Sequence, residues 1–251
     1  MKVFGFHLPM MSSLIIWAIL WEIVGHLELT FLLPPLSSVF EKMWEIVPTA
    51  SFLSALWDTG RAFIIGTLSA IAIGVPVGVL MGQSVIIDRL LLPWVNMFLS
   101  APLTALVPVL MILFGIGERT VIITTALFAI WIIVLDARAG VKQITPSLVE
   151  MARSYGASRW QAFHKIYIWA ALPEILAGIR IGFIRAVKGV IIGQLLVSIV
   201  GFGRLFELYS ANFLMEHFWA LLLVLFFFAF VLAEGLAALE RLVEYYASSR
   251  S

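Results

Sequence analysis

Few residues in this sequence have the type and spacing that catalysis or metal binding requires. The chain has 251 residues and no cysteine, and its four histidines, His7, His26, His164 and His217, are scattered. It contains no H-E-x-x-H pair for zinc and no G-x-x-x-x-G-K-[ST] loop to hold ATP phosphates. Without cysteine, thiolate chemistry and disulfides are excluded. The sequence therefore predicts neither an enzyme nor a metal or cofactor site on this chain.

Cations within an apolar run give a clearer signal. Arg180, Arg185 and Lys188 occur in "IRIGFIRAVKGVIIGQLL", inside an apolar segment of about 175–200. At about 100° per residue, Arg185 lies about 140° from Arg180 and Lys188 falls between them, so the three share one side of a helix. Arg180 is close enough to one end to reach the membrane surface. Arg185 and Lys188 would each cost roughly 2.5–3.5 kcal/mol at the bilayer centre, so we expect them to face protein or water. The alternative for Lys188 is a structural pair with a neighbouring span.

A second signal is the charged, amphipathic stretch "TPSLVEMARSYGASRWQAFHKIYIWAALPEIL" at 145–176. Thr145 as N-cap and Pro146 in the first turn predict a helix start. Ser147 and Glu150 form a competing capping box that would start the helix two residues later. One apolar face of this helix is formed by Leu148, Ala152 and Tyr155.

Gly156 follows this helix, at a place where a departing chain often needs a positive φ. Ser158 and Gln161 form another capping box and predict a second helix. The apolar face of this second helix is formed by Trp160, Phe163 and Tyr167. Pro173 marks the junction with the next apolar segment. Two short helices joined by a glycine turn suit a groove in a partner protein, and the alternative is a helical loop that packs only on its own bundle.

The elements that carry these residues are predicted to be transmembrane. The sequence is 62% hydrophobic and 12% charged, with a mean hydropathy of +1.06, whereas soluble domains carry roughly twice that charge. A span needs about 20 mostly apolar residues. The segments that qualify are 12–24, 61–81, 90–114, which Pro102 and Pro108 interrupt, 120–135, 175–200 and 218–239. We expect an all-α integral membrane protein of about six transmembrane helices, a single transmembrane domain over 1–251, and a module of about 137–174 between spans four and five.

The N-terminal apolar run lacks an A-x-A-like cleavage site, so we expect a retained first span rather than a signal peptide. After this run, apolar residues at helical spacing predict a helix, either on the membrane surface or packed as an ordinary connecting helix. These residues are Val39, Met43, Trp44 and Val47.

The second span carries a row of glycines that favours close helix contacts, namely Gly66, Gly74, Gly78 and Gly82. Lysine and arginine are more frequent in the segments that are cytoplasmic when the N-terminus is inside. The positive-inside bias therefore places the 137–174 module in the cytoplasm.

The module resembles the signature of inner-membrane permease subunits of bacterial ABC importers. That signature reads Glu-Ala-Ala, three residues, Gly, nine residues, Ile, one residue, Leu-Pro. The matching places hold Glu150, Met151, Ala152, Gly156 and Ile166, with Met151 in place of an alanine and Ile168–Trp169 in place of Leu-Pro. The segments "GASRWQAF", "LPEILAGIRIGFIRA", "LVSIVGFG" and "APLTALVPVLMILFGIGE" resemble the branch that imports nitrate, sulfonates, taurine and related compounds. The resemblance covers about 33–242.

This resemblance implies several partners: a pair of cytoplasmic ABC ATPase subunits that bind ATP and Mg²⁺, a second permease copy and an extracytoplasmic substrate-binding protein. A heterodimer with a sister permease is the alternative to a homodimer. The residues that would contact the ATPase are Glu150, Met151, Ala152, Ser154, Tyr155, Gly156, Ala157, Ser158 and Arg159. Those that would anchor the module are Trp160, Phe163 and Pro173.

The resemblance also bears on the solute. Gln194 occupies a position where members of this branch often carry an acid, so we expect Arg185, Lys188 and Gln194 to line a pathway for a small anionic or zwitterionic solute. The alternative function is an ion-coupled secondary transporter, although the paired repeats and midplane acids typical of that class are not evident. The net charge of +1 gives no reason to expect nucleic-acid binding. The expected location is the bacterial inner membrane, in multiple passes.

Overall fold

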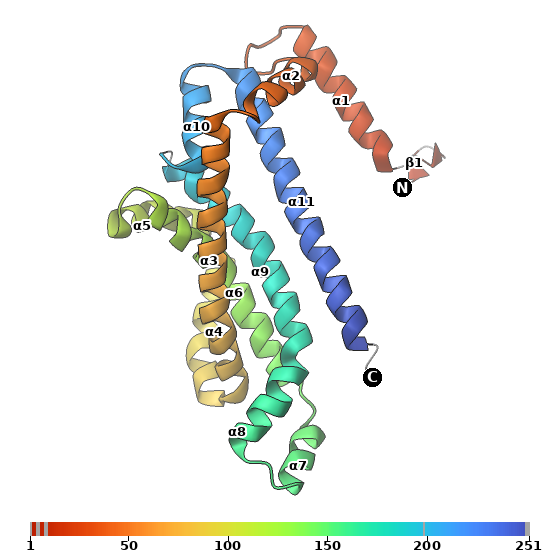
Figure 1. Ribbon diagram of the computed structural model, residues 1–251, viewed down its shortest axis with the longest axis vertical. Coiled ribbons are helices and arrows are strands. Elements are labelled where there is room, and N and C mark those ends of the chain that lie inside the picture. The colour runs from red at the N-terminus through yellow and green to blue at the C-terminus, as the bar shows by residue number, and fades with distance from the viewer. Residues whose placement is uncertain (1, 4–5, 8–9, 198, 249–251) are drawn as a thin grey trace.

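The computed structural model describes residues 2–3, 6–7, 10–197 and 199–248, and this part of the chain is almost entirely helical (Figure 1). Two strands of two residues each, β1 (Lys2–Val3) and β2 (Phe6–His7), pair antiparallel. The helices are α1 (Met10–His26), α2 (Leu36–Ile46), α3 (Ala50–Gln83), α4 (Val85–Ser100), η1 (Leu103–Leu106), α5 (Val107–Phe114), α6 (Glu118–Lys142), α7 (Pro146–Ser154), α8 (Arg159–Ala162), η2 (Phe163–Tyr167), α9 (Ile168–Val197), α10 (Gly201–Ala211) and α11 (Met215–Ser248).

Within the described residues, the apolar segments expected to span the membrane are mostly helical, with helix ends at Ser100 and Val197 inside two of them. Among the helices that the structure describes, α3 and α6 are each long and apolar enough to cross a membrane, and the number rises to four if each of two bent helix pairs is one span. The first and last segments correspond to shorter apolar helices, Ser12–His26 and Met215–Val231. The all-helical membrane fold is thus confirmed, and the count of six spans stays a prediction.

The third segment is not one straight helix. Ala101 is extended, with φ −71° and ψ 146°, so α4 ends before Pro102, and the helical segments on either side are bent by 98°. Proline disfavours helical backbone in the residue before it and lacks the N–H that would continue the helix. Pro108, in contrast, lies in the first turn of α5, where its missing N–H has no helical partner to lose. Pro102 therefore breaks the segment and Pro108 does not.

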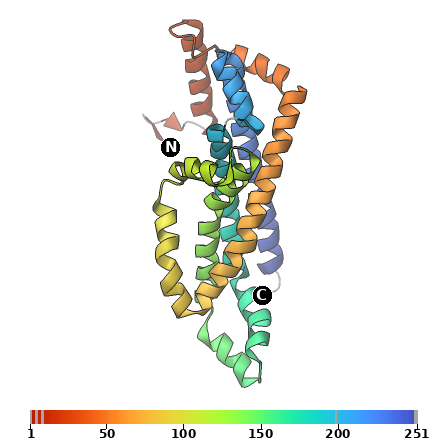
Figure 2. The same cartoon turned by 90° about the vertical axis from the view of Figure 1, so that its left-hand side faces the viewer.

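The centre of the molecule is a bundle of α3, α6 and α9, which run side by side in both views (Figures 1 and 2). Helix α6 lies between the other two and contacts glycines of both. A Cβ built on Gly78 of α3 would lie 2.4 Å from the Val134 carbonyl oxygen, and one on Gly182 of α9 would lie 2.6 Å from Ile133 Cγ1. The glycines of the second span therefore form close helix contacts, as the sequence predicts.

Helix α2 packs against the bundle rather than lying free on a surface. Val39 and Ile46 are buried in a cluster with residues of α3, α10 and α11, including Leu221. Trp44, by contrast, is 76% exposed, because it lies on the other side of this short helix. These contacts favour the interpretation of α2 as a packed connecting helix. Of the apolar face predicted for this helix, Val39 is buried but Trp44 is not. Helices α2 and α10 lie at the end of the bundle opposite α7 and α8 (Figure 1), which we call the far end.

Candidate functional site

The module between α6 and α9 projects from one end of the bundle (Figure 1). Its first helix, α7, begins at Pro146 after an extended Thr145, so the Thr145–Pro146 start is confirmed and the later start at Ser147 is wrong. The Thr145 side chain makes no capping hydrogen bond. Pro146 suffices to position the start, because its fixed φ suits the first helical turn.

The glycine turn has the geometry of a helix C-cap. Gly156 has φ +75°; its N–H donates to the Arg153 carbonyl at 2.9 Å, and the Ala157 N–H donates to the Ala152 carbonyl at 3.0 Å. This pair of bonds is the Schellman motif, in which a left-handed residue lets the chain reverse over the last turn of a helix. The positive φ predicted at Gly156 is therefore confirmed.

The second helix of the module starts with the predicted reciprocal capping box. The Ser158 N–H donates to Gln161 Oε1 at 2.8 Å, and the Gln161 N–H donates to Ser158 Oγ at 3.2 Å. Each side chain thus satisfies a backbone donor that the helix start leaves without a partner. Two consecutive caps therefore hold the turn between the helices through hydrogen bonds at both of its ends.

The tip of the module exposes large side chains. Ala152 is buried, whereas Met151 is 51% exposed and Tyr155 is 86% exposed. Tyr155 does not share the face of Ala152 as expected, because α7 ends at Ser154 and the following residue departs from helical geometry. Glu150, Ser154 and Ser158 are also exposed, and Ala157 is half-buried. The side chain of Arg159 lies outside the described residues.

Anchoring of the module to the bundle differs from the expectation. Phe163 packs against a buried cluster of α3, α6 and α9 that includes Val79, Ala137 and Ile175. Trp160 is 71% exposed and contacts Phe163 and His164, with ring centroids 6.1 and 3.9 Å away. Trp160 and Phe163 therefore do not face the bundle together, and a local π-helical turn, Phe163–Tyr167, begins at Phe163.

Pro173 does not mark a junction. It lies inside α9 and is exposed, and the helix continues through it. A proline on an exposed helix face is tolerated when the surrounding turns hold the helix in place. The expected boundary between module and span is therefore absent, and α9 joins the two directly.

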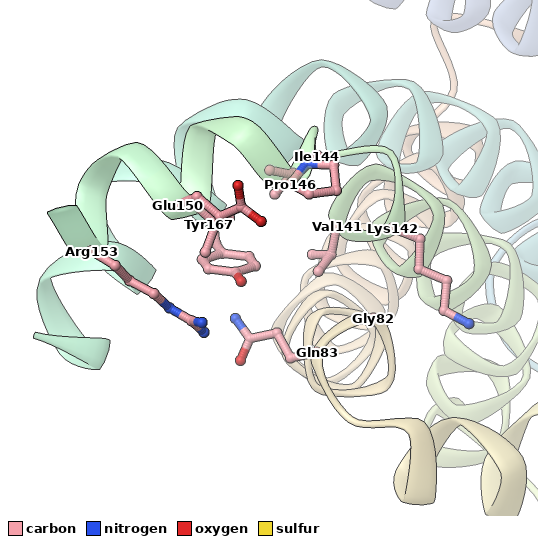
Figure 3. A pocket seen from close by; sticks show the side chains of 10 residues that line it. Gly82, Gln83, Val141, Lys142, Ile144, Pro146, Glu150, Arg153 and Tyr167 are labelled. Atoms are coloured by element: carbon pink, nitrogen blue, oxygen red, sulfur yellow. The ribbon is translucent and has the colours of Figure 1, made fainter. Parts of the chain in front are cut away.

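A cleft of about 380 Å³ separates the module from the ends of α3 and α6 (Figure 3). Gln83 of α3 and Glu150, Arg153 and Tyr167 of the module line it, and Figure 3 shows the side chains of Gln83 and Arg153 extending toward each other. A neighbouring hollow of about 310 Å³ shares Gln83, Arg153 and Tyr167. The module is therefore attached to the bundle mainly through α9 and has space on its other side.

At the same end of the molecule an ion cluster joins α4 to α6. Asp88, which is 7% exposed, accepts hydrogen bonds from Arg138 Nε, from Arg138 Nη2 at 2.9 Å and from Lys142 Nζ. No local sequence pattern predicts this cluster, because Asp88 and Arg138 are 50 positions apart. The sequence contained one indication of this cluster: an acidic residue and two basic residues lie at the expected cytoplasmic ends of adjacent apolar segments.

The polar residues of α9 do not face one common space within this chain. Lys188 is exposed, Arg185 is half-buried, and Gln194 is 1% exposed. Gln194 Oε1 accepts hydrogen bonds from Thr59 Oγ1 at 3.0 Å and from the Phe202 N–H at 3.2 Å. Among the described residues, no group of three histidine, aspartate or glutamate side chains could hold a metal ion.

The fold and the module together define a class: a helical membrane protein whose central bundle carries a projecting, glycine-turned helical module. The family described as "Binding-protein-dependent transport system inner membrane component" matches residues 74–245 of the chain. Because this match covers more than half of the sequence, the chain belongs to that family.

Individual relatives agree with this assignment. The taurine transport system permease protein TauC of Escherichia coli K12 is 31% identical over 92% of this chain and 86% of its own length. The bicarbonate transport system permease protein CmpB of a Synechocystis strain is 26% identical over 94% of this chain and 88% of its own length. A chain of the methionine ABC transporter MetNI in inward-facing crystal forms has the same fold, with a TM-score of 0.63, 22% identity and coverage of 75% and 94%.

The chain is therefore the transmembrane permease subunit of an ABC importer, a multi-pass inner-membrane subunit rather than an enzyme. Its relatives support the nitrate, sulfonate and taurine branch. The alternative of an ion-coupled secondary transporter is not supported. The family implies ATPase and substrate-binding-protein partners.

Proposed function

We propose that the module of about 137–174 binds a separate cytoplasmic ABC ATPase and couples its nucleotide cycle to movement of the single permease domain. The observation that carries this proposal is the tip of the module, where Met151 and Tyr155 are exposed next to the rigid Gly156 turn. Two large side chains on a preformed short helix suit a groove in another protein. The ATPase supplies ATP and Mg²⁺ binding.

The contact surface of the proposed module is formed by Glu150, Met151, Ala152, Ser154, Tyr155, Gly156, Ala157, Ser158 and Arg159. Met151 and Tyr155 enter the groove, Glu150 meets the charged rim, and Ala152, which is buried, keeps α7 close to its neighbours. Phe163 connects the module to the bundle, so that displacement of the tip moves α9. The module faces the cytoplasm, and the far end of the bundle faces the binding protein.

Co-purification with the ATPase tests this proposal. Tyr155→Ala and Glu150→Lys should reduce the amount of ATPase bound per permease while leaving the permease in the membrane. Trp44→Ala is the matched control, since Trp44 is also an exposed aromatic, 76% accessible, but lies on α2 at the far end. ATPase binding that is equal in all three variants and the wild type would contradict docking at the module.

We further propose that Arg185 and Lys188 line the solute pathway and favour a small anionic or zwitterionic solute. Lys188 is exposed on α9 within this chain, and a cation in a span is stable only next to protein or water. The names of the relatives, which include taurine and bicarbonate permeases, support such a solute. Gln194 is not included, because its side chain is buried and hydrogen-bonded.

Lys188→Gln should preserve assembly with the ATPase but lower taurine uptake into vesicles that also contain the binding protein. Lys188→Arg should retain more uptake, because it keeps the charge. Loss of assembly in Lys188→Gln would show instead that this lysine is a structural partner of a neighbouring helix or subunit.

A further inference from the structure

The buried amide of Gln194 joins three helices at the far end. Its Oε1 accepts hydrogen bonds from the backbone N–H of Phe202, in α10, and from the hydroxyl of Thr59, in α3. Gln194 itself belongs to α9 and is 1% exposed, and Thr59 is 3% exposed. A buried polar group of this kind fixes the relative positions of its partners, because leaving it unsatisfied is costly.

The bond to Phe202 ties Gln194 to α10. The N-cap position of α10 is Val200, which makes no side-chain capping bond, and Gln194 supplies an acceptor for a backbone donor of the first turn. The contact is also close, because a Cβ built on Gly203 would lie 2.0 Å from the Gln194 carbonyl oxygen. Gln194 and the start of α10 therefore form one unit.

The bond to Thr59 is of a different kind, because a hydroxyl has a single hydrogen to donate. Thr59 Oγ1 lies 3.0 Å from Gln194 Oε1 and 2.7 Å from the carbonyl oxygen of Ala55, in its own helix. When the hydroxyl turns fully to Ala55, Gln194 Oε1 loses one of its two donors but keeps the one from Phe202. The contact between α3 and the α9–α10 unit can thus be released without leaving an orphaned polar group.

A small cavity lies beside this bond. It has a volume of about 120 Å³, and Asp58, Arg61, Ala62, Glu118, Val121, Gln194 and Val200 line it. Arg61 and Glu118 form a two-point ion pair between α3 and α6, with N–O distances of 2.6 and 2.5 Å. Separation of α9 and α10 from α3 would open this cavity toward the far side of the membrane.

Helix α9 connects the bond to the module. The helix is continuous from Trp160 to Val197, and at about 1.5 Å per residue it places Gln194 roughly 50 Å from Trp160. The module lies at one end of this helix (Figure 1), and Gln194 belongs to the last turn at its other end. A displacement of the module therefore reaches the Thr59–Gln194 bond through a single helix.

We propose that the Thr59–Gln194 hydrogen bond is a releasable latch, which holds the outer end of the permease closed and opens when the module is displaced. Thr59 and Gln194 act as positioning residues, and the small cavity beside them is the space that the latch covers. The latch rests on the proposed function for its driving force, since the ATPase displaces the module. The effect of the latch on the cavity, however, depends only on residues of this chain and can be measured without the ATPase.

The absence of native cysteine allows a direct test. Val121→Cys places one thiol in the cavity lining at a site that is 0% exposed. Its rate of reaction with a membrane-impermeant maleimide, added on the extracytoplasmic side, reports opening. Adding Thr59→Val, which keeps the shape but removes the hydroxyl, should raise this rate about fivefold, corresponding to about 1 kcal/mol, a usual net value for one hydrogen bond.

Two controls separate the latch from general loosening. Thr59→Ser keeps the hydroxyl and should label at the rate of the parent. Thr124→Val removes a buried hydroxyl that donates to the carbonyl four residues earlier in α6, at 2.8 Å, and should also label at the parent rate. Equal labelling of Thr59→Val and its parent, or an equal increase in Thr124→Val, would overturn the latch. If Thr59→Val fails to insert, Thr59→Ala removes the same hydroxyl without removing the Gln194–Phe202 bond and must also raise the labelling rate.

A second measurement links the latch to the ATPase. In the assembled importer without binding protein, Thr59→Val should raise ATP hydrolysis about fivefold relative to Thr59→Ser, because loss of one hydrogen bond weakens the closed state. A merely structural role would lower hydrolysis and uptake together, which would overturn the proposal. If labelling increases in the permease alone while the module fails to bind the ATPase, the latch stands and the proposed coupling fails.

Discussion

Gly156 is required because of its backbone conformation, and not because a larger side chain would collide with its neighbours. A Cβ built there would meet nothing within 4 Å, yet its φ is +75°. Left-handed backbone costs an ordinary residue roughly 1–2 kcal/mol, and β-branched residues are the least tolerant. The turn that positions Met151 and Tyr155 therefore depends on this glycine.

We expect Gly156→Val to leave the permease inserted but to lower ATPase binding and uptake together, since the Schellman turn no longer forms. Gly156→Asn is the matched variant, because asparagine tolerates the left-handed region, and it should keep most of both activities. Co-purification and uptake by vesicles measure the effect. A valine variant as active as the asparagine variant would show that the turn is not needed.

The Asp88 cluster is a second test at the scale of residues. Asp88→Asn leaves Arg138 and Lys142 without their carboxylate partner, and hydrogen bonds to charged groups contribute about 1.5–3 kcal/mol. The thermal unfolding midpoint in detergent should fall by several degrees. Glu45→Gln breaks the exposed Lys42–Glu45 pair and should change it little, because surface ion pairs contribute at most about 1 kcal/mol.

At the scale of elements, the approach of α3 to α6 depends on glycine at particular positions of one helix. A Cβ on Gly78 would lie 2.4 Å from a backbone oxygen of α6, whereas a Cβ on Gly60, in the same helix, would meet nothing within 4 Å. A backbone atom cannot move aside as a side chain can. The two glycines are therefore a matched pair for separating packing from helix propensity.

Gly78→Ala should destabilise the permease by roughly 1–3 kcal/mol, the usual cost of overpacking. Gly60→Ala should be neutral or stabilising by up to about 1 kcal/mol, because alanine favours helix. Thermal unfolding of the two variants in detergent compares them. If Gly60→Ala were the more damaging change, the close α3–α6 contact would not be what limits stability.

At the scale of the whole molecule, the homodimer expected from the family resemblance leads to a prediction about the end of α9. ATPase subunits that work as a two-fold pair need one module each. Leu196 and Ile199 are 46% and 52% exposed at this end, whereas Val197 and Phe202, beside them in sequence, are 3% and 2% exposed. Leu196 and Ile199 can therefore contact a second copy, whereas Val197 and Phe202 are already packed within this chain.

Single cysteines at Leu196 or Ile199 should therefore cross-link two copies in membranes, while single cysteines at Val197 or Phe202 should not. Dimer bands on non-reducing gels, with two differently tagged copies co-expressed, measure the result. Cross-linking only to a different permease subunit would favour a heterodimer, and cross-linking equally at all four positions would indicate non-specific contact.

The sequence by itself determined the features whose causes are local. The start of α7 at Pro146, the positive φ of Gly156 and the capping box of Ser158 and Gln161 all arise from residues within a few positions of one another. The apolar runs predicted the helices, because burying their backbone in lipid requires internal hydrogen bonds. The family signature could be read for the same reason, since its residues lie in one short segment.

Tertiary structure decided what depends on residues distant in the chain. Thr59 and Gln194 are 135 positions apart, and Asp88 is 50 positions from Arg138, so no local pattern could pair them. Trp160 is exposed while Phe163 packs against α3, α6 and α9, which depends on how the module sits on the bundle. Gln194, which from its sequence alone could line a pathway, is instead buried against α3 and α10, because side-chain environment is set by the packing of whole helices rather than by position in one of them.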